Sequence, residues 1–130
     1  MRVILCHGCF DVFHVGHALH LQEAAKLGGK LVVSITAARY IRKPDRPIFN
    51  DEERTAMLMA LRCVDEVYVC KEDTGATAIL LYKPQYYVKG NDYTTIHPKE
   101  MVACTKTGAQ IVFTRSKKYS STEVIRRVSQ

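Results

Sequence analysis

The chain has 130 residues, of which 47% are apolar, 25% are charged and 8% are aromatic. This composition is that of an ordinary globular protein and excludes low-complexity, collagen-like and coiled-coil chains, and the length predicts one domain over residues 1–130. The 19 basic and 13 acidic residues leave a net charge of +6, which favours a polyanionic partner such as a nucleic acid, a membrane surface or a nucleoside triphosphate.

Short β-branched runs alternate with helical patterns along the whole chain. Strands are expected at residues 2–6, 31–35, 66–70, 85–88 and 109–113, and helices at 17–27, 50–61, 76–82, 97–107 and 120–128. This alternation predicts an α/β fold, a Rossmann-like doubly wound sheet of five parallel strands with helices on both faces. Ligands of such sheets bind beyond the carboxyl ends of the strands, where the strand order reverses.

The distribution of apolar residues and cysteines indicates where the protein acts. No apolar run approaches the roughly 20 residues that span a bilayer, and none resembles the hydrophobic region of a signal peptide. The five cysteines are odd in number and irregularly spaced, as expected where thiols stay reduced. We therefore expect a soluble, cytoplasmic protein without a membrane partner.

Two histidines stand in the loop of residues 8–17, where the first expected helix begins. A helix N-terminus offers unpaired N–H groups to anions, and Gly8 and Gly16 let the backbone approach a ligand closely. The imidazoles of His14 and His17 can donate hydrogen bonds to phosphate oxygens. The loop thus predicts a site that holds a triphosphate and stabilises the charge on a phosphorus under attack. The alternative is that one histidine packs in the core and the other caps the helix.

Two further loops carry cations beside the expected carboxyl ends of strands. The basic loop of residues 39–46 could close over a triphosphate or could simply be a solvated loop. After the fourth strand, Lys89 could neutralise a phosphate, Gly90 could let the backbone approach a base or ribose, and Asp92 could accept hydrogen bonds. A turn of Gly, Asn and Asp also forms without any function.

The segment before the last expected helix combines a cation with hydroxyl groups. Arg115 precedes Ser120, Ser121 and Thr122, which stand at the expected helix N-terminus. Hydroxyl and N–H groups at such a position form a second candidate anion site. The alternative is a plain helix cap provided by Ser120.

Several segments resemble a known family. The segment GCFDVFHVGH resembles the H-x-G-H signature of the cytidylyltransferase-like nucleotidyltransferases. The segments RPIFNDEER, ALRCVDEVYV, KEDT, KPQYYVKGNDY and KKYSSTEVIRRV resemble successive blocks of the adenylyltransferase domain of ADP-heptose synthase. RSKKYSST is also in register with the R-T-x-G-I-S-T-T motif of the glycerol-3-phosphate cytidylyltransferases.

The resemblance implies an enzyme that transfers a nucleoside monophosphate from ATP or CTP to a sugar or polyol phosphate and releases pyrophosphate. It implies Mg²⁺ bound with the triphosphate, no metal bound by the protein itself, and a homodimer. The implied catalytic residues are His14, His17, Lys43 and Arg115, and Arg46 is a further candidate phosphate ligand. The implied nucleotide-binding residues are Gly8, Cys9, Phe10, His14, Gly16, His17, Lys89, Gly90, Asp92, Arg115, Tyr119, Ser120, Ser121 and Thr122.

The resemblance leaves the base and the acceptor open. The VKGNDY block favours the adenylyl enzymes, whereas the register of Arg115 favours the cytidylyl enzymes. Relatives commonly carry an acidic residue just after the second strand, where this chain has Ala37 and Ala38. The acceptor or dimer contacts made from that position are therefore expected to differ.

Two other classes of function remain as alternatives. A nucleic-acid-binding basic domain would suit the net charge, but the basic loops carry only Tyr40 and Tyr119 as stacking aromatics, which disfavours nucleic acid as a partner. A zinc or thiol redox module could use Cys6 and Cys9 with the two histidines. Only four residues separate the two pairs, against about twelve in a zinc finger, and Cys6 falls inside an expected strand.

Overall fold

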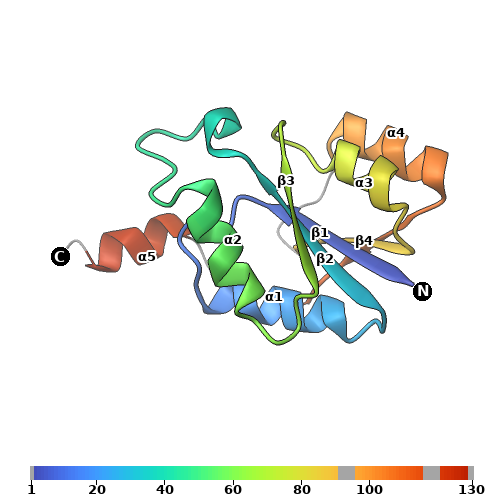
Figure 1. Cartoon of the computed structure of the whole chain (residues 1–130), viewed down its shortest axis with the longest axis horizontal. Coiled ribbons are helices and arrows are strands. Elements are labelled where there is room, and N and C mark those ends of the chain that lie inside the picture. Colours follow the sequence, from blue (N-terminus) through green and yellow to red (C-terminus); the bar gives the residue numbers. More distant parts are fainter. Residues whose placement is uncertain (1, 91–95, 116–120, 129–130) are drawn as a thin grey trace.

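The sheet of the protein consists of five parallel strands. The computed structural model describes residues 2–90, 96–115 and 121–128. The strands lie in the order β3-β2-β1-β4-β5 (Figure 1). Their bounds are β1 (Val3–Gly8), β2 (Lys30–Thr36), β3 (Glu66–Cys70), β4 (Tyr86–Lys89) and β5 (Gln110–Phe113). The predicted α/β architecture is confirmed.

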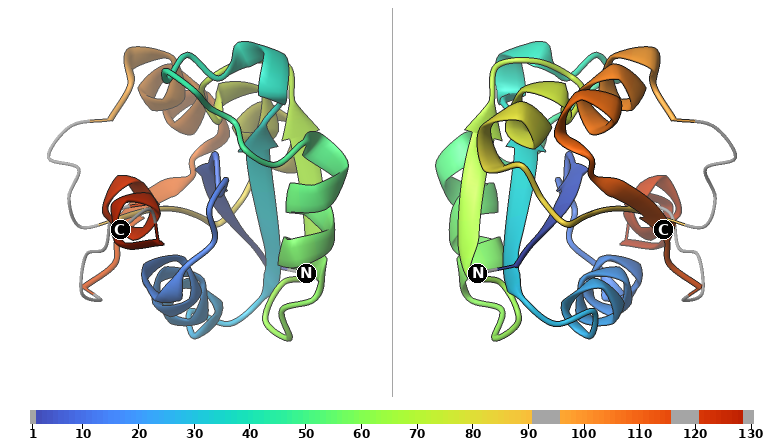
Figure 2. Two further views of the ribbon diagram at one scale, coloured as in Figure 1. Left: turned by 90° about the vertical axis from the view of Figure 1, so that its left-hand side faces the viewer. Right: turned by 90° about the vertical axis from the view of Figure 1, so that its right-hand side faces the viewer.

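The helices lie on both faces of the sheet (Figure 2). Buried side chains of α1 (Val15–Ala25) and α2 (Asp51–Met59) pack on one face, and those of α3 (Ala76–Tyr82) and α4 (Pro98–Thr107) pack on the other. The last helix, α5 (Ser121–Val128), lies near the N-terminal end of α1 in both views. A short 3₁₀ helix at Ala38–Tyr40, which the sequence did not predict, follows β2.

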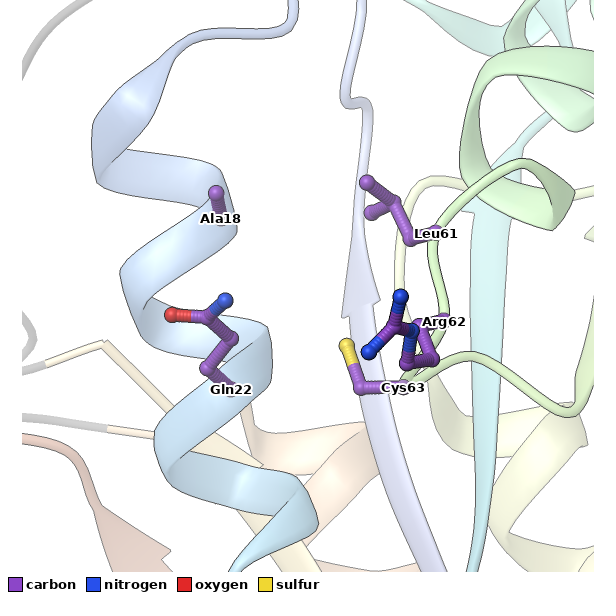
Figure 3. A pocket seen from close by; sticks show the side chains of 5 residues that line it. All are labelled: Ala18, Gln22, Leu61, Arg62 and Cys63. Atoms are coloured by element: carbon purple, nitrogen blue, oxygen red, sulfur yellow. The ribbon is translucent and has the colours of Figure 1, made fainter.

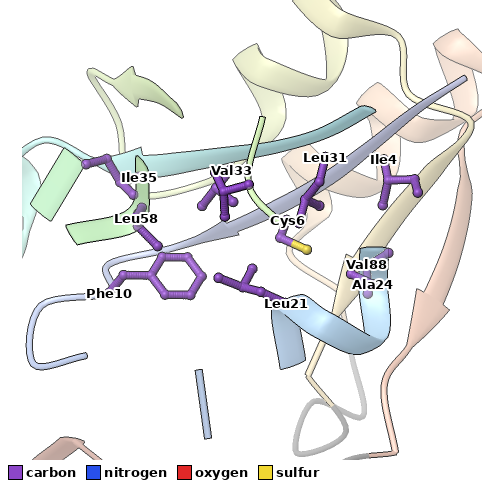
Figure 4. Close-up of a cluster of buried hydrophobic side chains, with 11 residues drawn as sticks. Ile4, Cys6, Phe10, Leu21, Ala24, Leu31, Val33, Ile35, Leu58 and Val88 are labelled. Atoms are coloured by element: carbon purple, nitrogen blue, oxygen red, sulfur yellow. The ribbon is translucent and has the colours of Figure 1, made fainter. Parts of the chain in front are cut away.

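The period of two in a strand divides the core into two layers. Ile4 and Cys6 of β1 point toward α1 and α2, where they meet Leu21 and Leu58 (Figure 4). Leu5, between them in sequence, points to the opposite face and belongs to the layer under α3 and α4. Each fully buried aliphatic side chain of this kind contributes about 1.5–3 kcal/mol. Both faces of β1 are therefore fixed, which holds the loop after it in place.

The helix starts reflect their capping residues. Asn50 accepts a hydrogen bond from the Glu53 amide at 2.8 Å, and Glu53 accepts one from the Asn50 amide at 2.9 Å, as the capping pattern predicted. The first helix begins at Val15, two residues earlier than expected, because the imidazole of His14 acts as its N-cap. The predicted cap at Ser120 lies outside the described residues.

The strand order places a binding crevice at a defined point of the sheet. The chain runs outward from β1 through β2 to β3 and then crosses back to β4, so the order reverses between β1 and β4. The carboxyl ends of these two neighbours carry Gly8 and Lys89. This is the point at which open parallel sheets bind ligands. None of the helices formed by the described residues has the length and apolar character of a membrane span.

Candidate active site

The first turn of α1 holds both predicted catalytic histidines in defined hydrogen bonds. Nδ1 of His14 accepts a hydrogen bond from the Gly16 amide at 3.0 Å, and Nδ1 of His17 accepts one from the His14 amide at 3.3 Å. The two rings stack with their centroids 3.9 Å apart and their planes at 24°. Because each Nδ1 is an acceptor, each neutral ring carries its proton on Nε2. The pair therefore supplies two Nε2–H donors at a helix N-terminus.

The surroundings of the pair keep both rings neutral. Burial lowers the pKa of His17 to about 3, and the nearby positive charges of Lys43 and Arg46 act in the same direction. Burial also lowers the pKa of His14. Both side chains nevertheless keep part of their surface exposed, so neither is sealed inside the core. At neutral pH they can donate hydrogen bonds to an anion without first gaining a proton.

Aromatic packing fixes the plane of His17. Its ring meets Phe10 edge-on at 5.1 Å between centroids and lies 5.3 Å from the ring of Phe13. Phe10 is buried and has a positive φ of 49°. A Cβ added to Gly8 would lie 2.9 Å from the edge of the Phe10 ring. The glycine therefore makes room for the aromatic ring that supports His17, in addition to any close approach to a ligand.

Asp11 joins the histidine loop to the basic loop that follows β2. Its buried carboxylate accepts hydrogen bonds from Nε of Arg46 and from the amides of Ile48 and Phe49. Burial alone would raise the pKa of Asp11, but these hydrogen bonds lower it below its usual value. Arg46, predicted as a candidate phosphate ligand, is thus paired with Asp11. Lys43, on the same loop, is exposed to solvent.

Arg54 of α2 stabilises the loops that follow β1 and β2. Its side chain is fully buried, and one terminal nitrogen donates to the carbonyl oxygens of Cys9 at 3.0 Å and Thr36 at 2.7 Å. The other terminal nitrogen lies 2.6 Å from the Asp51 carboxylate, which also accepts from the Ala38 amide at 2.7 Å. One guanidinium therefore connects the loop after β1 to the end of β2. The sequence prediction did not identify this role.

The carboxyl end of β4 carries a further ion pair. Nζ of Lys89 lies 3.5 Å from Glu100 of α4, whose carboxylate also accepts from the Gly75 amide at 2.8 Å. The Lys89 side chain is only 11% exposed. Lys89 lies at the predicted edge of the sheet, but its ammonium is paired with the Glu100 carboxylate. To bind a phosphate, the ammonium would have to contact both anions or break its ion pair with Glu100.

Polar side chains also fix the ends of β1 and β2. Nδ1 of His7 lies 2.8 Å from the Ser34 hydroxyl, and Nε2 lies 3.1 Å from the Thr36 hydroxyl. Burial lowers the pKa of His7 to about 4, so the ring is neutral at physiological pH. Both of its nitrogens are engaged inside the fold. His7 therefore supports Gly8 and the loop after it.

The remaining predicted residues are only partly described. Arg115, just after β5, is exposed, and Gly90, just after β4, is partly exposed. Asp92, Tyr119 and Ser120 lie outside the described residues, as do the side chains of Ser121 and Thr122 in the first turn of α5. The structure therefore brings together the ends of β1, β4 and β5, and the part of the nucleotide site predicted at residues 116–122 stays a prediction.

The cysteines and a nearby pocket lie apart from the histidine pair. Cys6 is buried, and burial raises the pKa of its thiol far above the ordinary value, whereas Cys9 is partly exposed. Among the described residues, no group of three or more His, Cys, Asp or Glu side chains could hold a metal ion. The pocket in Figure 3 lies between α1 and the segment after α2, and it contains none of the predicted site residues. Its lining consists of Ala18, Gln22, Leu61, Arg62 and Cys63.

Comparison with known proteins settles the family. A model of the cytidylyltransferase-like family matches residues 5–127. The chain belongs to this family. Cytidylyltransferase-like membership places it among the nucleotidyltransferases, which confirms the family and enzyme class predicted from the histidine loop and the blocks that follow it.

Curated relatives of this cytidylyltransferase-like chain are longer proteins. The bifunctional protein HldE of Syntrophotalea carbinolica is 42% identical over 105 residues, which cover 77% of this chain and 21% of the relative. HldE of Pelobacter propionicus is 35% identical over 133 residues, which cover 98% of this chain and 27% of the relative. The chain therefore spans about a fifth to a quarter of the length of these relatives.

Solved structures share the fold. The lipopolysaccharide core biosynthesis protein of Thermoplasma volcanium has a TM-score of 0.77 and 27% identity, covering 91% of this chain and 99% of that one. A pantothenate synthetase of Thermus thermophilus has a TM-score of 0.63 and 16% identity, covering 95% of this chain and 61% of that one. The second likeness concerns the fold alone.

Proposed function

We propose that this cytidylyltransferase-like chain transfers a nucleoside monophosphate from ATP or CTP to the phosphate group of a sugar or polyol phosphate. The observation that carries the proposal is the pair of neutral imidazoles, His14 and His17, at the N-terminus of α1, where the strand order reverses. The sequence blocks that resemble ADP-heptose synthase support a sugar phosphate acceptor. The relatives named HldE agree with that resemblance.

The chemistry is an in-line displacement. An oxygen of the acceptor phosphate attacks the α-phosphorus of the nucleotide, a new P–O bond forms, and the bond to the bridging oxygen breaks as pyrophosphate leaves. The attacking oxygen is already an anion, so the step needs neither a protein nucleophile nor a general base. The protein contributes orientation and stabilisation of the negative charge that develops on the phosphoryl oxygens.

The two histidines supply donors where that charge develops. Their Nε2–H groups are held in place by stacking and by backbone hydrogen bonds at Nδ1, so little reorganisation is needed when the phosphoryl group becomes more negative. Lys43 and Arg115, both exposed, add positive charge from two other loops. The backbone of Cys9, Phe10 and Gly16 lines the nucleotide in this proposal.

Magnesium fits the site as a companion of the triphosphate. Mg²⁺ prefers oxygen ligands and usually binds through substrate phosphates together with one or two carboxylates. Asp11, the acidic side chain of the histidine loop, already accepts three hydrogen-bond donors. In this proposal the ion would therefore be held by phosphate oxygens of the substrate, where it would supply positive charge.

We also propose which nucleotide is the donor, which oligomer the protein forms and in which cellular compartment it acts. The VKGNDY block supports an adenylyl donor ahead of a cytidylyl donor. The resemblance to the family supports a homodimer. The five free cysteines support the reducing environment of the cytoplasm.

A pyrophosphate-release screen tests the proposal. The four common nucleoside triphosphates are each combined with Mg²⁺ and a panel of sugar and polyol phosphates, and pyrophosphate is measured with and without acceptor. We expect release that requires one acceptor class and is fastest with ATP or CTP. Absence of release with every pair, or release at the same rate without any acceptor, would contradict nucleotidyl transfer to a phosphorylated sugar or polyol.

A further inference from the structure

Two polar side chains of α1, one and two turns beyond His17, contact the segment just after β5. Nδ1 of His20 lies 2.9 Å from the hydroxyl of Thr114. The two carboxylate oxygens of Glu23 accept the amide hydrogen of Arg115, at 3.0 and 2.8 Å. We call these contacts the α1–β5 tether. They join parts of the chain that are more than 90 residues apart in sequence.

The tether also reaches the end of β4. Thr114 is buried, and its amide donates to the carbonyl oxygen of Lys89 at 2.9 Å. The helix that carries the histidine pair, the end of β4 and the start of the segment after β5 are thus linked through one threonine and one carboxylate. These are three of the regions from which the proposed nucleotide site is built.

We propose that His20 and Glu23 are positioning residues that hold Arg115 in place for binding the triphosphate. The inference rests on the proposed function, because it takes the nucleotide as the ligand of Arg115. The guanidinium stands on a long side chain, and fixing its backbone reduces the conformational freedom that is lost when it binds a phosphate. Because the anchor is on α1, the position of Arg115 is set relative to His14 and His17 on the same helix.

A purely electrostatic role for Glu23 predicts the opposite effect on binding. A carboxylate near a triphosphate repels it, so removing its charge should tighten binding. A positioning carboxylate should instead weaken binding when it is removed, because the Arg115 amide loses its acceptor. Glutamine separates the two roles, since Glu23→Gln removes the charge and keeps an oxygen that can accept the same hydrogen bond.

The test is a double-mutant cycle on nucleotide affinity. Binding of Mg-ATP and of Mg-CTP is measured by calorimetry for Glu23→Ala, Arg115→Ala and the double variant, because residues that act through one another give non-additive losses. We expect Glu23→Ala to weaken binding roughly tenfold in the natural background and less than twofold when Arg115 is already alanine. His20→Ala should show the same dependence. Glu23→Gln should bind within about twofold of the natural protein.

Gln22→Ala serves as the matched control. Gln22 is the exposed neighbour of Glu23 on α1, and its replacement should leave affinity unchanged. Equal losses from Glu23→Ala in both backgrounds, no loss, or tighter binding by Glu23→Gln would each overturn the positioning role. If the natural protein binds neither nucleotide, the proposed function fails together with the inference. Normal binding with additive losses overturns the inference alone.

Discussion

Replacing His17 with asparagine is expected to lower kcat by about 10²–10³, the effect of removing one preorganised donor from a developing oxyanion. Asparagine keeps an oxygen that can accept the His14 amide hydrogen, as Nδ1 of His17 does, but it offers no donor at the position of Nε2. The helix start should therefore remain intact while the chemistry fails. Pyrophosphate release under saturating substrates measures the loss, and urea denaturation checks the fold.

Two companion variants make this result specific. His17→Gln places an amide N–H near the position of Nε2, so it should retain more activity than His17→Asn. His97→Ala removes a histidine that caps α4, where Nδ1 accepts the Lys99 amide at 3.1 Å, and it should leave kcat unchanged. Near-normal turnover by His17→Asn, or an equal loss in His97→Ala, would remove His17 from the mechanism.

Replacing Arg54 with alanine is expected to cause the largest loss of stability. The guanidinium is fully buried and donates to the backbone carbonyl oxygens of Cys9 and Thr36 and to the partly exposed Asp51, so truncation leaves the two carbonyl oxygens without this donor beside a cavity. Each buried acceptor left without a partner costs about 1–3 kcal/mol, and the cavity adds to this loss. We expect the free energy of unfolding to fall by about 3–4 kcal/mol, as measured by urea denaturation.

The neighbouring arginine provides the control for Arg54. Arg62 is exposed, three residues beyond the end of α2, and Arg62→Ala should change the free energy of unfolding by less than about 0.5 kcal/mol. Arg54→Lys should lie between alanine and the natural residue, because one ammonium cannot reproduce the forked contacts of the guanidinium. A loss below about 1 kcal/mol in Arg54→Ala would show that the loops after β1 and β2 are held by other contacts.

The fold follows closely from local sequence signals. Near-continuous apolar runs such as residues 31–35 become strands buried on both faces, and the Asn50–Glu53 pattern begins a helix as predicted. The start of α1 was placed two residues late because a histidine serves as its cap, and imidazole is not among the side chains that normally signal an N-cap. The histidine pair was visible from its spacing and its place between a strand and a helix.

Polar contacts between segments that are distant in sequence could not be predicted from local sequence signals. Arg54 lies four residues before Leu58, and both are on the buried face of α2. Helical periodicity therefore indicates that an arginine occupies a core position. Nothing local indicates that its partners are Cys9 and Thr36. The pairing of Glu23 with the amide of residue 115 likewise depends on how β5 packs beside α1, which the sequence of either segment alone does not specify.

His14 and His17 are expected to act as neutral rings whose Nε2–H groups contact the phosphates of a bound nucleotide. Nitrogen-15 NMR of the histidine side chains, recorded between pH 8 and pH 5 with and without Mg-ATP or Mg-CTP, tests it most directly. Because Nδ1 of His17 accepts the His14 amide hydrogen, we predict the Nε2–H tautomer. Because burial lowers the pKa of His17 to about 3, the ring should not gain a proton as the pH falls over this range. Nucleotide should shift Nε2 of His14 and His17 and leave His97 unchanged. An Nδ1–H tautomer, titration of His17 above pH 5, or no response to either nucleotide would contradict the claim.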